Sequence, residues 1–306
     1  MRESQVVLGV DPDPCALWPE AVKAAGSERE RLALALSDAG HAAGVSMGAA
    51  SETAAAVLAH CRALIDAAAP ACVAAKPQLA HFERLGAPGW LALEAVCAHA
   101  RAAGLLVIAD AKRGDVASTA FAYGQALVGE TPSPFGGVPG LRADAFTANP
   151  LLGRDALEPM VAAARAAGSG VFVLVRTSNP GAADLMDLAL ASGEPLWERL
   201  AALAAEIGHV GPAGLADVGA VTGATVPEHL ERMRELMPHT PFLLPGIGAQ
   251  GGDVAALAPA FSVGRAGGLV SASRSIAGAH TARGGPPGDA ARAEAERLRE
   301  TAWKLA

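Results

Sequence analysis

The chain has 306 residues, of which 51% are hydrophobic and 4% aromatic, and its formal charge at pH 7 is −7. This is enough apolar material for one large buried core, since α/β barrels of roughly 250 residues form single units. The acidic balance, without a Lys- or Arg-rich segment, argues against nucleic acid or an anionic membrane surface as a partner and favours a small molecule.

The cysteines and the N-terminal segment exclude several other classes. Cys15, Cys61, Cys72 and Cys97 have no CxxC or Cys/His ligand spacing, and three of them fall in apolar stretches typical of packed positions, so we expect neither a metal site nor a disulfide framework. The N-terminus lacks the basic and long apolar regions of a signal peptide, and no window of about 18 apolar residues is free of charge. We therefore expect a cytoplasmic protein.

Short apolar runs alternate with longer segments of helical periodicity, which is typical of a parallel sheet covered by helices. The predicted strands are Gln5–Val10, Ala71–Ala75, Leu105–Ala109, Ala143–Thr147, Val171–Val175, Leu215–Val221, Pro241–Leu244 and Gly267–Ser271. The predicted helices are Ala54–Ala69, Gly89–Ala103, Ala156–Ala167, Leu196–Ile207, Glu228–Met237 and Ala290–Lys304. This α/β alternation predicts a (β/α)8 TIM barrel, although periodicity alone does not exclude an open doubly wound sheet.

We expect one barrel domain over residues 1–306. Residues 26–48 predict a helical insertion between the first strand and its helix, and residues 290–304 predict a C-terminal helix. Glu130–Leu141, rich in Pro and Gly, predicts an irregular loop that folds over a site, and Ala279–Asp289 predicts a surface connection.

Six of the predicted strands are followed directly by polar or charged groups. These are Asp11, Lys76, Asp110, Arg176 to Asn179, Gln250 after a glycine turn, and Arg274. In a barrel, such positions meet at the C-terminal face, where active sites lie. The pattern therefore predicts one site built from many strands.

The segment LLVIADAKRGDVAST carries the main chemical candidates. Residues two apart on an extended chain point the same way, so Asp110 and Lys112 can face one ligand, and Asp115 lies where the next helix should begin. Alone, the run could be an ion pair and a helix cap, but its place after a buried strand favours a site. Lys76 also ends an apolar strand, where its charge needs a partner such as Asp110 unless it reaches solvent at the rim.

A glycine-rich segment near the C-terminus predicts a phosphate site. It reads Pro245-Gly-Ile-Gly-Ala-Gln250-Gly251-Gly252 and is followed one strand later by Ser273-Arg274-Ser275. Glycines let backbone N–H groups approach an anion, and barrel phosphate sites recur after strands seven and eight. Arg274 adds a planar guanidinium suited to phosphate. No acidic residue ends the next strand, so the segment is not a dinucleotide fingerprint.

Two further polar positions allow alternative interpretations. Ser178, in Arg176-Thr-Ser-Asn-Pro-Gly181, can bind the edge of a heterocycle or belong to a simple turn, and Asp11 can bind ribose hydroxyls or cap a turn. Gly44-Val-Ser-Met-Gly48 matches the nucleophile-elbow pattern but follows a polar segment, so we interpret it as a loop. His41, His60, His99 and His209 are expected on helix surfaces, which gives no support for a hydrolase.

Together these motifs resemble the orotidine 5′-monophosphate decarboxylases. The segments VDPDP, AAKPQLAHFERLG, TANPLLGRD and VRTSNPGA are similar to the longer bacterial subgroup, and the resemblance runs in order from about Val6 to Ile276. The D-x-K-x-x-D pattern alone is shared with the 3-keto-gulonate-phosphate decarboxylases. Asn179 departs from the histidine of many relatives, and Ala272-Ser273 precede Arg274 where many have Gly.

The resemblance implies a barrel that works as a homodimer and converts orotidine 5′-monophosphate to uridine 5′-monophosphate in de novo pyrimidine biosynthesis, without a cofactor or metal. It implies catalytic roles for Lys76, Asp110, Lys112 and Asp115, with Lys112 as proton donor, and it places Asp115 and Thr119 in the partner's site. The substrate contacts that it implies are Asp11, Thr119, Ser178, Pro245, Gln250, Gly251 and Arg274.

Two alternatives remain at this level. One is a metal-dependent sugar-phosphate decarboxylase or epimerase on the same barrel, which has no use for a pyrimidine contact at Ser178 or Gln250. The other is a non-catalytic sensor of a phosphate ligand. A sensor is expected to have lost one charge of the Lys-Asp-Lys-Asp set, and all four are present.

Overall fold

The eight predicted strands form a closed parallel barrel. The computed structural model describes residues 3–40, 48–224, 228–247 and 252–305, with the backbone alone at residues 31 and 33–40. The strands are β1 (Val6–Val10), β2 (Ala74–Pro77), β3 (Leu106–Arg113), β6 (Ala145–Ala148), β7 (Gly170–Arg176), β8 (Val218–Thr222), β9 (Phe242–Leu244) and β10 (Gly268–Ala272). They pair in the order β1-β10-β9-β8-β7-β6-β3-β2, and β2 closes on β1. The (β/α)8 barrel is confirmed and the open sheet is wrong.

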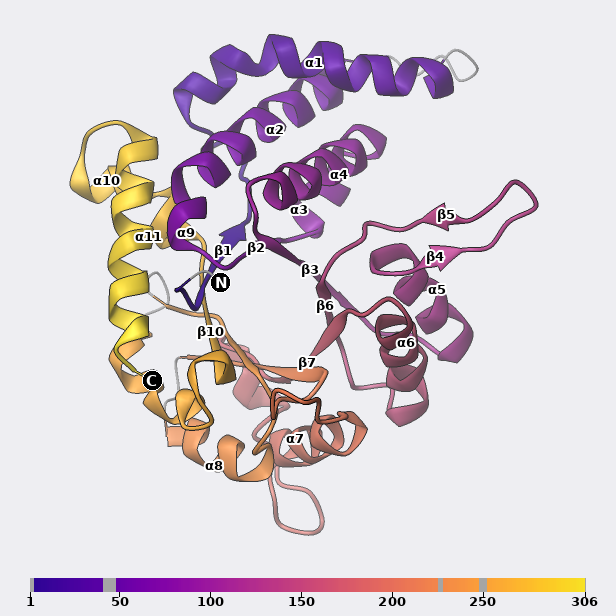
Figure 1. Cartoon of the computed structure of the whole chain (residues 1–306), viewed down its shortest axis with the longest axis vertical. Coiled ribbons are helices and arrows are strands. Elements are labelled where there is room, and N and C mark those ends of the chain that lie inside the picture. Colours follow the sequence, from indigo (N-terminus) through magenta and orange to yellow (C-terminus); the bar gives the residue numbers. More distant parts are fainter. Residues whose placement is uncertain (1–2, 41–47, 225–227, 248–251, 306) are drawn as a thin grey trace.

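Helices surround the barrel on its outside (Figure 1). They are α1 (Pro19–Gly40), α2 (Ala49–Ala68), α3 (Ala80–Glu83), α4 (Ala87–Ala102), α5 (Ala117–Leu127), α6 (Arg154–Ala166), α7 (Leu196–Ile207), α8 (Glu228–Leu236), α9 (Arg274–Ala277), α10 (Ala279–Arg283) and α11 (Pro287–Trp303). All six predicted helices are present. Short 3-10 helices cover Ala69–Ala71, Pro180–Asp184, Val254–Phe261 and Arg265–Gly267.

The interior of the barrel is filled by alternate residues of the strands. A small apolar cluster there contains Val7, Ala74, Ile108, Ala145, Phe172, Leu174, Val221 and Leu243. Because successive side chains of a strand point to opposite faces, the residues two positions further along face the same interior. On β2, β3 and β6 these residues are Lys76, Asp110 and Thr147. A polar layer thus lies directly above an apolar layer, at the carboxyl ends of three neighbouring strands.

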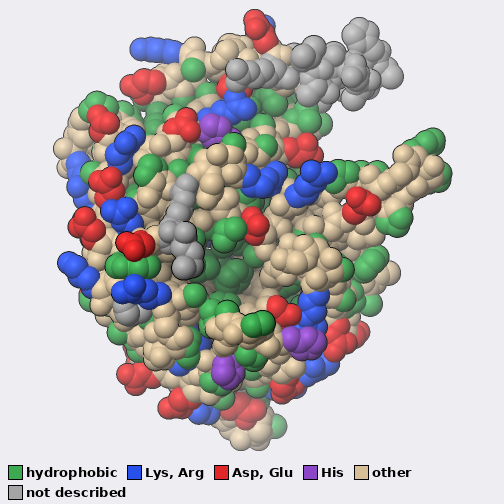
Figure 2. Space-filling view, viewed as in Figure 1, with side chains coloured by type: hydrophobic (Ala, Val, Ile, Leu, Met, Phe, Trp, Pro, Cys, Tyr) green, Lys and Arg blue, Asp and Glu red, His purple; other side chains and the backbone are tan. Residues whose placement is uncertain are grey.

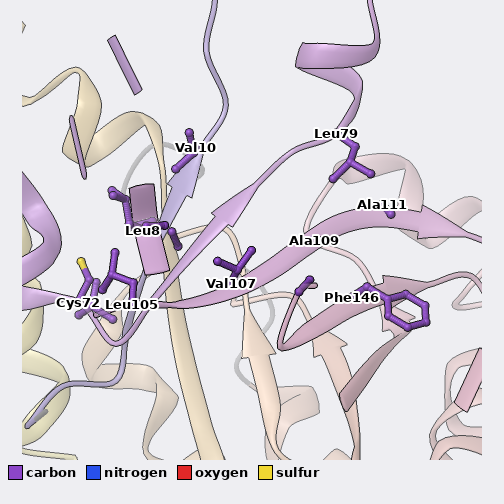
Figure 3. Close-up of a cluster of buried hydrophobic side chains, with 14 of the residues drawn as sticks. Leu8, Val10, Cys72, Leu79, Leu105, Val107, Ala109, Ala111 and Phe146 are labelled. Carbon is purple, nitrogen blue, oxygen red and sulfur yellow. The ribbon is translucent and has the colours of Figure 1, made fainter. Parts of the chain in front are cut away.

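The other face of each strand packs against the helices. A second, larger apolar cluster lies between the strands and the helices. It includes the fully buried side chains of Leu8, Val107, Ala109 and Phe146, which Figure 3 shows on β1, β3 and β6. Fully burying a side chain the size of Leu or Phe contributes roughly 1.5–3 kcal/mol. This outer core holds the strands in place and therefore positions the polar layer at their ends.

Several segments differ from their predicted form. Glu130–Leu141 is not wholly irregular, because β4 (Glu130–Thr131) and β5 (Val138–Pro139) pair in an antiparallel hairpin that projects from the barrel (Figure 1). Ala279–Asp289 contains α10 rather than only a surface connection. Helix α1 begins at Pro19, before the predicted insertion. The segment 41–47, which holds most of the nucleophile-elbow match, lies outside the described residues.

Helix α5 is absent from the predicted set, since its sequence ASTAFAYGQAL mixes small polar residues and glycine with apolar ones. Gly124 explains part of this composition: a Cβ there would lie 2.5 Å from Cβ of Ala163 in α6. Gly124 allows α5 and α6 to pack closely. The contact between the helices therefore requires glycine there, although glycine has a low helix propensity.

Helix α2 is enclosed by the fold. The segment Ala49–Ala71 has the length and hydropathy of a membrane span, but 78% of its apolar window is buried inside the structure. His60, predicted on a helix surface, is buried in α2, where its Nδ1 accepts a hydrogen bond from the backbone N–H of Trp18 at 3.1 Å. That prediction is wrong because the ring of Trp18, directly before α1, packs edge-on against the ring of His60, with 5.1 Å between the ring centroids.

Candidate active site

A buried carboxylate between two ammonium groups lies at the centre of the polar layer. Nζ of Lys76 donates to Oδ2 of Asp110 at 2.5 Å, and Nζ of Lys112 donates to Oδ1 at 2.5 Å. Lys76 and Asp110 are buried, whereas the side chain of Lys112 is 42% exposed. Lys76 is thus held inside the barrel by its ion pair and does not reach solvent at the rim. Lys112 remains accessible to a ligand.

The pKa values of the two buried partners follow from this geometry. Burial alone would raise the pKa of Asp110, but the charges and hydrogen bonds of Lys76 and Lys112 hold it well below its usual range. Burial alone would lower the pKa of Lys76, but Asp110 and, to a lesser extent, Asp11 hold it above its ordinary value. Asp110 and Lys76 are therefore both ionised near neutral pH. The two lysines and one aspartate of the cluster carry a formal net charge of +1, which suits an anionic ligand.

The backbone of β3 bends where it presents these groups. The pairing of β3 with β6 shifts register between Ala109 and Arg113, and Lys112 has a φ of +48°. A left-handed conformation is costly for a long L side chain and indicates a local constraint. Thr147 supplies one contact at this bend, since its hydroxyl accepts from the backbone N–H of Lys112 at 2.8 Å.

Asp115 and Thr119 do not join this cluster within one chain. Oδ1 of Asp115 accepts from the backbone N–H of Val116 at 2.7 Å, and among the described residues no hydrogen bond or ion pair joins Asp115 to Lys76, Asp110 or Lys112. The N-cap of α5 is Val116 rather than Asp115, so the helix-cap interpretation does not hold. Both Asp115 and Thr119 are half-buried near the start of α5.

A cavity of about 100 Å³ lies beside the charged cluster. It is lined by Asp11, Lys76, Pro245, Gly246, Ile247, Ser271, Ser273 and Arg274. Oδ1 of Asp11 is buried and has no hydrogen-bond partner in the described part of the chain, so this oxygen can accept from a ligand. Asp11, Pro245 and Arg274 thus line one cavity, whereas Gln250 and Gly251 lie outside the described residues.

Gly9 allows β1 and β10 to approach at this cavity. A Cβ on Gly9 would lie 2.5 Å from Cβ of Ser273, the residue before Arg274. Real Cβ atoms do not approach so closely. The absence of a side chain at Gly9 therefore lets the start of α9, which carries Arg274, lie against the barrel mouth.

The segment after β7 contains one structural residue and one candidate contact. Arg176 is buried and forms a bidentate pair with Asp187, with both N–O distances 2.9 Å. This pair fixes the loop after β7 and holds the pKa of Asp187 below its usual value. Ser178 is half-buried beside β8, where a Cβ on Gly223 would lie 2.9 Å from its Cα. Ser178 does not line the cavity above.

One protein family has a model that matches most of this chain. The model of the family described as "Orotidine 5'-phosphate decarboxylase / HUMPS family" matches residues 39–284. The chain belongs to this family.

Relatives with the decarboxylase name cover most of the chain. The orotidine 5′-phosphate decarboxylase of Rhodopirellula baltica is 44% identical over 225 residues, which is 72% of each protein. That of Haloarcula marismortui is 41% identical over 90% of this chain and 82% of its own. The solved OMP decarboxylase of Leishmania donovani is 31% identical with a TM-score of 0.67, covering 99% of this chain and 94% of that one. These relatives do not favour the sugar-phosphate alternative.

In this family member, the structure brings together Lys76, Asp110 and Lys112, and beside them Asp11, Pro245 and Arg274. Sequence reasoning missed Thr147, which also donates a hydrogen bond to Oδ1 of Asp110 at 2.9 Å. A threonine inside an apolar strand is ordinary, since β-branched residues favour strands. The only available signal was its position, two residues after the interior-facing Ala145.

Proposed function

We propose that this chain removes CO2 from orotidine 5′-phosphate to give uridine 5′-phosphate in pyrimidine biosynthesis, and that the reaction needs no cofactor. The observation that carries this proposal is the buried carboxylate of Asp110, held between the ammonium groups of Lys76 and Lys112 beside a cavity that ends at Arg274. Membership of the decarboxylase family supports the same reaction.

The chemistry requires a fixed cation at C6 of the pyrimidine. When the bond from C6 to the carboxylate breaks, CO2 leaves and an electron pair remains in an in-plane orbital that the ring cannot delocalise. The ammonium of Lys112 stabilises this carbanion and then donates its proton to C6, after which solvent reprotonates the lysine. Lys112 suits this role because its Nζ is held by Asp110 yet its side chain stays partly exposed.

Asp110 and Lys76 orient the proton donor. Asp110 fixes Nζ of Lys112 through one oxygen, and Lys76 fixes Asp110 through the other. A barrier of this type needs on the order of 20 kcal/mol of differential stabilisation, more than one ion pair supplies. Contacts to the rest of the substrate must therefore contribute.

The remaining predicted contacts each bind a different part of the substrate. Asp11, whose buried Oδ1 has no hydrogen-bond partner among the described residues, binds the ribose hydroxyls, and Ser178 binds the pyrimidine edge. The phosphate is bound by Arg274 with Pro245, Gln250 and Gly251. Binding of this remote dianion closes loops over the site and converts binding energy into rate.

The active unit is proposed to be a homodimer in which Asp115 and Thr119 enter the partner's site. Both residues lie near the start of α5, and among the described residues no hydrogen bond or ion pair joins Asp115 to the charged cluster of its own chain, which supports this arrangement. A second aspartate would bring the net charge of the array to about zero. We further propose a cytoplasmic location, which agrees with the burial of α2 inside the fold and with the mixing of Lys, Arg, Asp and Glu over the face that Figure 2 shows.

One assay tests the reaction. The loss of orotidine 5′-phosphate absorbance is followed in the presence of a metal chelator, for the wild type, Lys112→Ala and the control Lys23→Ala, which removes an exposed lysine of α1. We expect activity in the wild type and the control, and a loss of at least about 1,000-fold in Lys112→Ala. An inactive wild type, or activity abolished by the chelator, would contradict the proposal.

A further inference from the structure

Thr147 connects the side chain of one proposed catalytic residue to the backbone of another. Its hydroxyl donates to Oδ1 of Asp110 at 2.9 Å and accepts from the backbone N–H of Lys112 at 2.8 Å. The residue lies on β6 and is 1% exposed. Because an N–H can only donate, its bond fixes the hydroxyl oxygen as acceptor and leaves the single hydroxyl proton for Asp110.

The contact lies at a strained position of the backbone. Lys112 and Arg142 are the two residues other than glycine with a positive φ in the described part of the chain. Such a conformation is unfavourable for a long side chain and persists only where surrounding contacts determine it. The pairing of β3 with β6 is irregular at this bend, so the N–H of Lys112 takes the hydroxyl of Thr147 as its partner instead.

The same hydroxyl limits how Asp110 can turn. Oδ1 of Asp110 accepts from both Nζ of Lys112 and Oγ1 of Thr147, while Oδ2 accepts from Nζ of Lys76. Each carboxylate oxygen is therefore anchored by a group from a different neighbouring strand, since Lys76 lies on β2 and Thr147 on β6. The carboxylate plane is held from both sides.

We propose that Thr147 is a positioning residue for the reaction: its hydroxyl fixes the rotamer of Asp110 and the bend at Lys112 together, so that Nζ of Lys112 meets the reacting carbon. This inference rests on the proposed decarboxylation. Thr147 does not touch the substrate. Its effect therefore falls on the chemical step, with little effect on binding, because the cavity is lined by other residues.

The test compares Thr147→Val, which keeps the shape without the hydroxyl, with Thr147→Ser, which keeps the hydroxyl. Thr222→Val is the matched control. Thr222, like Thr147, lies near the carboxyl end of a barrel strand and is buried, but its hydroxyl has no hydrogen-bond partner in the described part of the chain. For each variant, kcat and KM are measured for orotidine 5′-phosphate, together with the Kd for uridine 5′-phosphate and the melting temperature.

We expect kcat of Thr147→Val to fall about 10- to 100-fold, as for loss of a hydrogen bond to a charged group. The Kd should change less than about threefold, since ligand contacts are kept. Thr147→Ser and Thr222→Val should stay within about threefold of wild-type kcat. If Thr147→Val does not fold, Thr147→Ala serves in its place with the same expectation.

Two outcomes would overturn the proposal. One is wild-type kcat in Thr147→Val. The other is a loss of kcat in Thr147→Val that Thr147→Ser shares, or that comes with an equal loss of nucleotide binding, because either result indicates a packing role. An inactive wild type would instead contradict the proposed function, and the two failures are thereby distinguished.

Discussion

Nζ of Lys76 lies 2.5 Å from Oδ2 of Asp110, and both side chains are buried at the mouth of the barrel. Removing two charges from water is costly, so the pair is stable only because each partner compensates the other. Because Asp110 also binds the ammonium group of Lys112, one carboxylate compensates two cations. The cluster is therefore more sensitive to loss of Asp110 than to loss of either lysine.

Asp110→Asn should destabilise the fold as well as abolish activity. The substitution leaves the buried ammonium of Lys76 without its negative partner, which typically costs about 3–5 kcal/mol. The control Asp66→Asn alters an exposed carboxylate that pairs with His99 on the surface and should change stability by less than about 0.5 kcal/mol. Urea unfolding of the three proteins measures the difference. Equal stability of Asp110→Asn and the wild type would show that the pair is not buried as described.

His60 predicts how stability changes in mild acid. Burial, with a smaller contribution from the charge of His280, lowers the pKa of His60 to about 4 from 6.5. Below pH 6.5 the imidazole of His60 binds a proton in the unfolded chain but not in the folded chain. The contribution of His60 to the free energy of unfolding is therefore fully present above pH 6.5 and is lost as the pH falls toward 4. The loss amounts to about 3 kcal/mol.

The measurement is urea unfolding at several pH values between 4 and 7, for the wild type and His60→Asn. Asparagine retains an acceptor for the backbone N–H of Trp18 but does not titrate. The stability of the variant should therefore decline less steeply over this range. His99→Gln, in a surface pair with Asp66, is the control histidine. Parallel pH curves for the wild type and His60→Asn would refute the assignment.

Strand positions and the main charged cluster were predictable because both depend on local pattern. Buried parallel strands are continuous apolar runs, and charges that end several such runs, as at Lys76 and Asp110, favour a shared site over isolated ion pairs. Thr147 and His60 were not predictable in this way. The contacts of Thr147 depend on a left-handed bend at Lys112, on another strand. The burial of His60 depends on its contact with Trp18, which is 42 residues away in the sequence. Both are tertiary facts without a local signature.

Gly9→Ala should weaken binding of the phosphate group. The added methyl would lie 2.5 Å from Cβ of Ser273, so Ser273 must shift and move the adjoining Arg274, the first residue of α9, from the cavity. We expect kcat/KM to fall at least about tenfold, since misplacement by an ångström is costly in an organised site. Gly26→Ala is the control, because no atom lies within 4 Å of the added methyl in α1 and alanine favours a helix. Comparable kcat/KM in both variants would contradict the close approach.

The proposed division of the site between two chains can be tested by mixing inactive subunits. Lys112→Ala and Asp115→Ala should each abolish activity. If Asp115 acts in the partner's site, a mixed dimer carries both substitutions in one site and none in the other. Random reassortment of equal amounts of the two variants should then restore about one quarter of wild-type activity.

The matched control is a mixture of Lys112→Ala with Asp110→Ala. Asp110 and Lys112 contact each other within one barrel, so each site of a mixed dimer contains one of the two substitutions and the mixture should stay inactive. Restoration in the first mixture but not the second would identify Asp115 as a residue contributed across the interface. Restoration in neither mixture, despite exchange of subunits shown by mass, would place Asp115 in the site of its own chain.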